Sequence, residues 1–103
     1  MKRDQGLIIA RQFKNLLLSK GLPIQRVVLF GSVAKGTARD DSDIDIAVIT
    51  LPFLPSRIKE GSSILHTSKD IDIRIETVTL HPDDFDRPFF TLGSEIERTG
   101  VEV

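Results

Sequence analysis

Acidic residues alternate with apolar residues in two segments of this 103-residue chain. Asp43 and Asp45 lie in the sequence DIDIAVI, and Asp70 and Asp72 lie in DIDIRIETVT. Side chains two residues apart point to the same face of a strand, so each segment presents two carboxylates together. If the two strands pair, Asp43, Asp45 and Asp72 converge on one patch.

Carboxylates that lie close together repel one another unless a cation neutralises them. Their hard oxygens suit Mg²⁺ or Mn²⁺, which complete their coordination with water and substrate phosphates. Two such ions, about 3.5–4 Å apart, can clamp the attacking and leaving oxygens of an in-line displacement. The chemistry that this pattern favours is therefore a metal-assisted in-line displacement on a phosphate-bearing substrate.

The Asp-x-Asp spacing is weak evidence by itself. The chain contains ten Asp, a number that produces about one such pair by chance. Four pairs occur, at 41/43, 43/45, 70/72 and 84/86. A solvated strand face explains most single pairs. The context is more informative, because Asp is disfavoured in strands and two of these pairs nevertheless alternate with Ile.

A second motif, Gly31-Ser32, follows the apolar run IQRVVLF of residues 24–30. A strand that ends at Gly-Ser and leads into a short helix presents free backbone N–H groups and a hydroxyl, which favour a phosphate. Lys35 and Arg39 follow at spacings that can bring two cations to the same phosphates. Taken singly, Gly-Ser is a common turn and each cation is typical of a solvated surface.

The elements that must position these residues follow from apolar periodicity and chain breakers. A helix is predicted over residues 5–20, with Asp4 as its N-cap and Gly21 at its C-terminal turn. Strands are predicted over 24–30, 43–49 and 70–79, and short helices over 33–36, 56–65 and 89–99. This order predicts one α/β (α+β) domain over residues 1–103, with a small mixed β-sheet and helices packed on one face.

Composition excludes several other classes of protein. The chain has no Cys, Trp or Tyr, which excludes disulfide frameworks and thiolate metal sites and argues against a stacking platform for nucleic acid. No apolar run approaches the roughly 20 residues needed to cross a bilayer, so a cytoplasmic location is expected. Residues 1–39 carry eight Lys/Arg and one acid, whereas residues 40–103 carry six Lys/Arg and fourteen acids. This asymmetry suits a site that handles phosphates and cations, although two solvated surfaces explain it as well.

One pattern in the sequence resembles the signature of the nucleotidyltransferase fold. It consists of Gly31-Ser32, ten intervening residues and Asp43-Ile44-Asp45. The stretch FGSVAKGTARDDSDIDIAV, residues 30–48, resembles the minimal nucleotidyltransferase (MNT) group of the polymerase β superfamily. The segment at 71–74 is similar to the strand that carries the third carboxylate in DNA polymerase β. Residues 95–101 are similar to the ends of many MNT chains.

The resemblance implies a role for each matching residue. Gly31 and Ser32 would hold the triphosphate, and Asp43 and Asp45 would ligate two Mg²⁺ or Mn²⁺ ions. Asp72 would be the third carboxylate, as a metal ligand or as the general base toward an acceptor hydroxyl. Asp70 is its rival on the same strand face, and Asp72 is preferred because Ile flanks it on both sides. Lys35 and Arg39 are the accompanying nucleotide-binding candidates.

The resemblance also implies a reaction and a partner. A hydroxyl would attack the α-phosphorus of a nucleoside triphosphate, here ATP, and pyrophosphate would leave. MNT proteins are often encoded beside a small helical HEPN-family protein, for which they act as antitoxins, and some transfer AMP to a tyrosine of that toxin. This chain has no Tyr, so the acceptor is expected in trans. Larger relatives carry a further domain for the acceptor; we therefore expect a shallow site that a partner completes.

Three other functions remain open at this stage. A module of the same fold with a vestigial site would neutralise a toxin by contact alone, and fold does not separate it from an enzyme. Transfer to a small molecule such as an antibiotic is disfavoured by the missing second domain. Binding of DNA or RNA through the basic N-terminal helix is disfavoured by the net charge of −1. Whether the chain forms a homo-oligomer is also open.

Overall fold

A computed structural model describes residues 1–103. The predicted helices and strands appear in the predicted order, and the structure adds a 3-10 helix over 82–86 and a short strand over 101–102. In order they are α1 (Arg3–Ser19), β1 (Ile24–Phe30), α2 (Gly31–Lys35), β2 (Ile44–Thr50), α3 (Arg57–Ser68), β3 (Ile75–Leu80), the 3-10 helix η1 (Pro82–Asp86), α4 (Thr91–Thr99) and β4 (Val101–Glu102). None of the helices is both long enough and apolar enough to cross a membrane.

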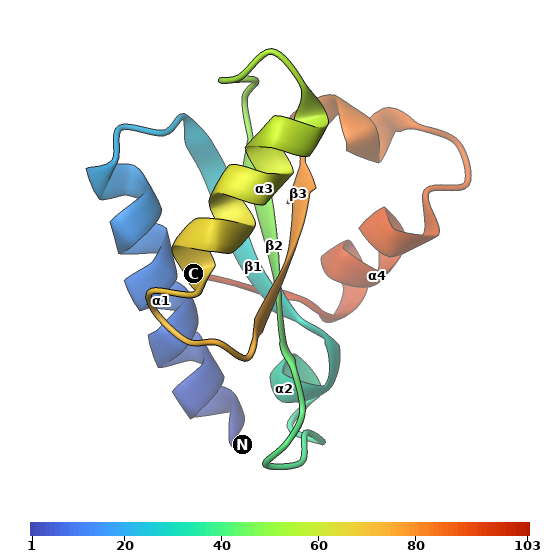
Figure 1. Ribbon diagram of the computed structural model, residues 1–103. Coiled ribbons are helices and arrows are strands. Elements are labelled where there is room, and N and C mark those ends of the chain that lie inside the picture. The colour runs from blue at the N-terminus through green and yellow to red at the C-terminus, as the bar shows by residue number, and fades with distance from the viewer.

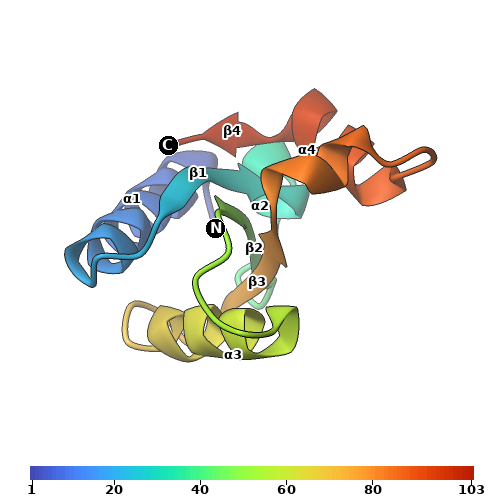
Figure 2. The ribbon, with the colours of Figure 1, turned by 90° about the horizontal axis from the view of Figure 1, so that it is seen from above.

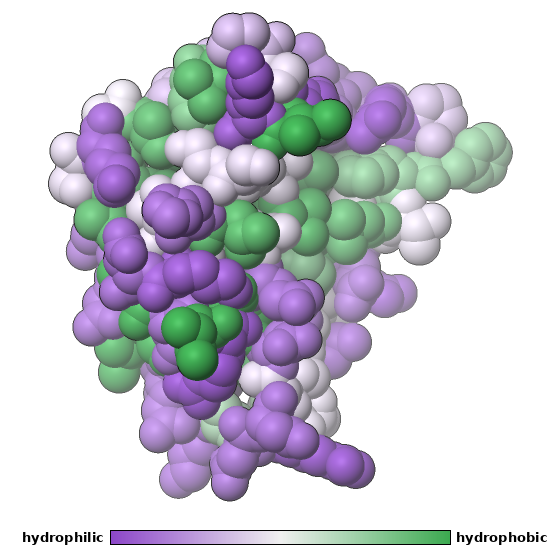
Figure 3. Space-filling model, in the orientation of Figure 1, coloured by the Kyte–Doolittle hydropathy of each residue, from purple (hydrophilic) through white to green (hydrophobic).

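The four strands form one mixed sheet in the order β3-β2-β1-β4. β1 is antiparallel to β2 and β4, whereas β2 and β3 are parallel because α3 carries the chain back between them. The end of β1 therefore meets the starts of β2 and β3 at one end of the sheet, where α2 lies (Figure 1). Hydrophilic side chains dominate this lower end in the same orientation (Figure 3).

Helices cover the two faces of the sheet unequally. α1 and α3 pack on one face and α4 lies over part of the other (Figure 2). Ile44, Ile46 and Val48 of β2 belong to the cluster of 12 buried residues under α1 and α3. Ala47 and Ile49 belong to a cluster of 6 with Ile96 of α4. The prediction of a small mixed sheet with packed helices is confirmed, but the expectation that the helices lie on one face is wrong, because Ile96 of α4 packs on the opposite face.

The largest difference from the sequence prediction is the start of the third strand. The alternation from residue 70 predicts a strand, but α3 continues to Ser68 and β3 begins only at Ile75. The N–H of Asp72 donates to the carbonyl of Ser68 at 3.1 Å, and Asp72 Oδ1 accepts from the N–H of Arg74 at 2.9 Å. Asp side chains stabilise turns in this way, so this local bond replaces a strand.

The far end of the sheet holds a buried polar cluster, where β2 and β3 finish. Glu60 is only 1% exposed and accepts a 2.6 Å hydrogen bond from the N–H of Phe53 while pairing with His81 Nε2 at 2.7 Å. Asp84 accepts two bonds from the Arg57 guanidinium, at 2.7 and 2.8 Å. The Arg57 bonds outweigh desolvation and lower the pKa of Asp84 to about 2. Glu60 therefore links α3 to the loop after β2, and Asp84 links η1 to α3.

Candidate functional site

The Gly-Ser motif lies against the Asp-x-Asp motif at the end of the sheet. Phe30, the last residue of β1, is the register partner of Asp45 in β2, and α2 begins at the next residue, Gly31. Gly31 has a φ of +73°, and a Cβ built on it would overlap the Asp45 carboxylate. Glycine is thus required at this position for both its left-handed backbone and this close approach.

Two carboxylates are neighbours across β2 and β3. Asp45 is the register partner of Glu76, and both side chains lie on the α4 side of the sheet because Ile44 and Ile75 face α1 and α3. Asp45 is partly buried, whereas Glu76 and Asp43 are exposed. Burial raises the pKa of Asp45, and the charges of Glu76, Asp43 and Glu95 raise it further.

Glu76 is the site residue that sequence reasoning missed. The Asp-x-Asp pair at residues 70 and 72 is the stronger signal in this segment, and Glu76 lies outside that pair. A signal for Glu76 was present: it occupies a polar position of the alternation directly after Ile75, as Asp45 does directly after Ile44. The parallel register of β2 and β3 turns this shared position into spatial proximity.

Asp72 and Asp70 do not join this group in the structure. The expected strand position of Asp72 is wrong, because the residue lies in the turn before β3. Its carboxylate bonds Nε and Nη2 of Arg74 at 3.0 and 2.8 Å, and these bonds lower its pKa. Asp70 is exposed in the same turn. The carboxylate next to Asp45 in the strand register is therefore that of Glu76.

The three polar candidates after Gly31 lie in or just after α2. The carbonyl of Ser32 accepts a 3.0 Å hydrogen bond from the N–H of Thr37, which closes the turn after α2. Lys35 Nζ lies 3.8 Å from Glu95 Oε1 of α4. Arg39 is exposed, and its backbone N–H donates to Ser42 Oγ at 2.8 Å. Ser32 is therefore next to the Gly31–Asp45 contact, while Lys35 already has an acidic neighbour.

The chemistry of the acidic group fits a divalent cation. The charged neighbours that shift the pKa of Asp45 are all acidic, so a cation would relieve their mutual repulsion. No three Asp, Glu, His or Cys side chains are already gathered as a complete set of metal ligands. Mg²⁺ is commonly held by one or two carboxylates, with water and substrate phosphates supplying the rest. The Asp43/Asp45 pair meets that requirement.

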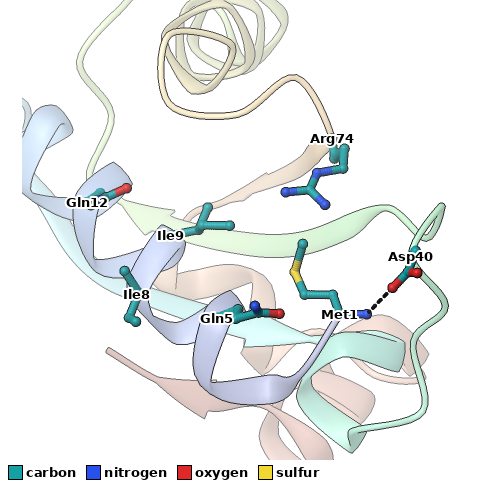
Figure 4. A pocket seen from close by; sticks show the side chains of 7 residues that line it. All are labelled: Met1, Gln5, Ile8, Ile9, Gln12, Asp40 and Arg74. Carbon is teal, nitrogen blue, oxygen red and sulfur yellow. Dashed lines mark hydrogen bonds and ion pairs between the residues drawn. The ribbon is translucent and has the colours of Figure 1, made fainter.

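The largest cavity lies elsewhere. It encloses about 560 Å³ and is lined by Met1, Gln5, Ile8, Ile9, Gln12, Asp40 and Arg74. Figure 4 shows residues of α1 on one side of this cavity and Arg74 on the other. None of the candidate residues Gly31, Ser32, Lys35, Arg39, Asp43, Asp45 and Asp72 lines it.

Three comparisons place these features among known proteins. The family model of the nucleotidyltransferase domain matches residues 10–87. No curated protein matches the chain significantly. A toxin–antitoxin complex with AMP-PNP contains a chain with 23% identity and a TM-score of 0.67, over 90% of this chain and 70% of that chain.

Two further solved structures share the fold. One is the MntA–HpeT toxin–antitoxin in a doubly Asp-to-Glu substituted form, with 22% identity and a TM-score of 0.66, over 90% of this chain and 70% of that chain. The other is a candidate minimal nucleotidyltransferase, with 21% identity and a TM-score of 0.68, over 100% and 97% of the two chains. At such identities these likenesses show the fold. The family model covers most of the chain, including both motifs, and the chain belongs to the nucleotidyltransferase domain family.

Proposed function

We propose that this protein is a metal-dependent nucleotidyltransferase that transfers AMP from ATP to a hydroxyl group of a partner protein. The observation that carries the proposal is the contact between Gly31 and Asp45. It joins the motif suited to a triphosphate to the motif suited to a divalent cation, at one end of the sheet.

In the proposed site, Asp43 and Asp45 hold the divalent cation, with two ions as the expected number. When bound, such ions neutralise phosphate charge and orient the reacting oxygens. Gly31 and Ser32 hold the triphosphate, because the glycine lets the backbone approach closely and the hydroxyl donates a hydrogen bond.

Lys35 and Arg39 supply positive charge to the same triphosphate. They follow Ser32 on α2 and on the loop after it. Catalysis then depends mainly on positioning and charge neutralisation.

The reaction exchanges one P–O bond for another. The acceptor hydroxyl oxygen forms a bond to the α-phosphorus of ATP, and the bond from that phosphorus to the oxygen bridging to the β-phosphorus breaks. Pyrophosphate leaves with the electron pair, and a carboxylate takes the hydroxyl proton. Glu76 is our preferred third carboxylate because it neighbours Asp45, and Asp72 is the alternative that the family resemblance implies.

The proposed acceptor belongs to a toxin, which we expect to be a small helical HEPN-family protein. Two of the similar structures are toxin–antitoxin complexes, and one of them contains AMP-PNP. The absence of Tyr from this chain rules out its own modification on tyrosine. A second function, neutralisation of the toxin by contact with an inactive site, is favoured by the hydrogen bonds that engage Asp72, the third carboxylate implied by the resemblance, with Arg74.

The test is transfer of label from [α-³²P]ATP to the purified partner in the presence of Mg²⁺. Asp43→Asn and Asp45→Asn should each abolish labelling, and Asp41→Asn, an exposed loop residue outside the pair, serves as the matched control. Labelling that persists in both site variants would refute the metal assignment. Toxin neutralisation by an unlabelled, fully folded complex would favour the binding module.

A further inference from the structure

α4 brings an acidic side chain to the border of the candidate site. Glu95 lies in this helix, far in sequence from the motifs at 31–45, yet its Oε1 is 3.8 Å from Lys35 Nζ. Its charge also contributes to the raised pKa of Asp45. The Glu95 carboxylate therefore interacts with both the Lys35 ammonium group of α2 and the acidic side chains of the sheet.

The geometry of the Lys35–Glu95 pair allows Lys35 to leave Glu95 for another negatively charged group. The side chains are 47% and 37% exposed, and their 3.8 Å separation is longer than a hydrogen bond. Exposed pairs of this kind contribute little to stability. The triphosphate of ATP carries several negative charges and can compete with a single carboxylate for the Lys35 ammonium group. We therefore expect this weak pair to exchange Glu95 for the triphosphate as the partner of Lys35, with little effect on the stability of the fold.

The surrounding charges decide when that exchange is favourable. Without a cation, ATP would meet the negative charges of Asp43, Asp45, Glu76 and Glu95 together. A divalent cation between the phosphates and Asp43/Asp45 removes most of this repulsion. In the absence of the cation, Glu95 adds a further negative charge that disfavours binding of the nucleotide.

We propose that Glu95 is a positioning residue that holds Lys35 beside the site in the free protein and makes ATP binding depend on a divalent cation. The inference rests on the proposed nucleotide-binding function and deepens it. Glu95 does not contact the reacting atoms. Its negative charge repels the phosphates of the nucleotide. Its pairing with Lys35 determines where the Lys35 side chain lies before ATP binds.

The test compares ATP affinities measured by calorimetry with Mg²⁺ and with EDTA. Glu95→Gln should raise the affinity in EDTA about three- to tenfold, the effect expected of one charge removed near a partly exposed site. It should change the affinity in Mg²⁺ much less, so the ratio of the two affinities narrows. Glu97→Gln is the matched control on α4, because Glu97 pairs with Arg26 and not with Lys35.

A second variant separates this role from a merely structural pair. Lys35→Met breaks the same contact but should weaken ATP binding in Mg²⁺, opposite in direction to the effect of Glu95→Gln in EDTA. If the pair only joins α2 to α4, both variants should lower Tm equally and leave the Mg²⁺/EDTA ratio at its wild-type value. That result overturns the inference.

The outcomes also distinguish the inference from the proposed function. If Asp45→Asn loses Mg²⁺-dependent ATP binding while Glu95→Gln behaves as wild type, the inference fails and the proposed function stands. If the wild-type chain, alone and with its partner, binds no ATP in either condition, the proposed function fails, and the inference fails with it. A narrowed ratio in Glu95→Gln alone supports both.

Discussion

Gly31→Ala tests the contact on which the proposed site depends. Two separate penalties are expected. An L-residue at φ +73° is strained by about 1–2 kcal/mol, and the lower entropy of the unfolded Ala chain offsets about 0.4–1 kcal/mol of this. The new methyl group also overlaps the Asp45 carboxylate, and overpacking of this kind costs about 1–3 kcal/mol. We expect a total loss of about 2–4 kcal/mol.

Gly36→Ala is the matched control for the backbone penalty. Gly36 has a φ of +75°, and nothing lies within 4 Å of a Cβ added there. This variant should lose about 1 kcal/mol, equivalent to a Tm lower by about 4–8 °C in a domain of this size. The difference between the two variants, measured by urea unfolding, isolates the contact with Asp45.

A double variant identifies the partner in that contact. In an Asp45→Ala background the carboxylate is absent, so Gly31→Ala should cost no more than Gly36→Ala does. A coupling of about 1–3 kcal/mol between Gly31 and Asp45 is therefore expected. Equal losses for Gly31→Ala and Gly36→Ala in the wild-type background would refute the reasoning, because the two motifs would then not be in contact.

Three further predictions follow from the structure. Glu76→Gln should reduce transfer at least about 100-fold, the usual contribution of a general base, while Asp72→Asn stays within a few-fold of wild type; a radiolabel assay that gives the opposite ranking assigns the role to Asp72. Asp84 has a folded-state pKa lowered from 3.8 to about 2, so its stabilisation is present above pH 3.8 and lost as the pH falls toward 2. Urea unfolding should show that Asp84→Asn removes up to about 2 kcal/mol of this acid-dependent stability, less to the extent that water screens the half-exposed Arg57. ATP and Mg²⁺ together, at about 100 times the Kd, should stabilise the chain by about 2.7 kcal/mol; a thermal shift with ATP in EDTA that equals the shift with Mg²⁺ would contradict the metal requirement.

Strongly local features were predictable from the sequence. The helix over 5–20 and the strand over 24–30 correspond to α1 and β1, because each has a clear apolar period and ends at Gly or at a turn. The strand at 43–49 is displaced by only one residue in β2. The acidic face of that strand was also predictable, since alternation alone determines which side chains share a face. Its link to the Gly-Ser motif was implied only by the family resemblance.

The third strand shows where prediction from the local sequence pattern failed. The alternation from 70 to 79 is equally compatible with a strand and with a turn followed by a strand. Asp72 bonds the backbone and the guanidinium of Arg74, and the turn that results delays the strand until Ile75. Propensity could not resolve this competition, because its outcome depends on how far α3 extends and on where its last turn leaves the chain.

By itself the sequence determined the motifs, their order and the family to which they point, because these depend on residue type and on spacing along one chain. Only the tertiary structure decided which carboxylate stands beside Asp45. The parallel register of β2 and β3 selects Glu76. The packing of α4 against the sheet places Glu95 near Lys35, a pairing across 60 residues that no local period encodes. Proximity between distant segments is a property of the packed core, and it becomes definite only when the chain has folded.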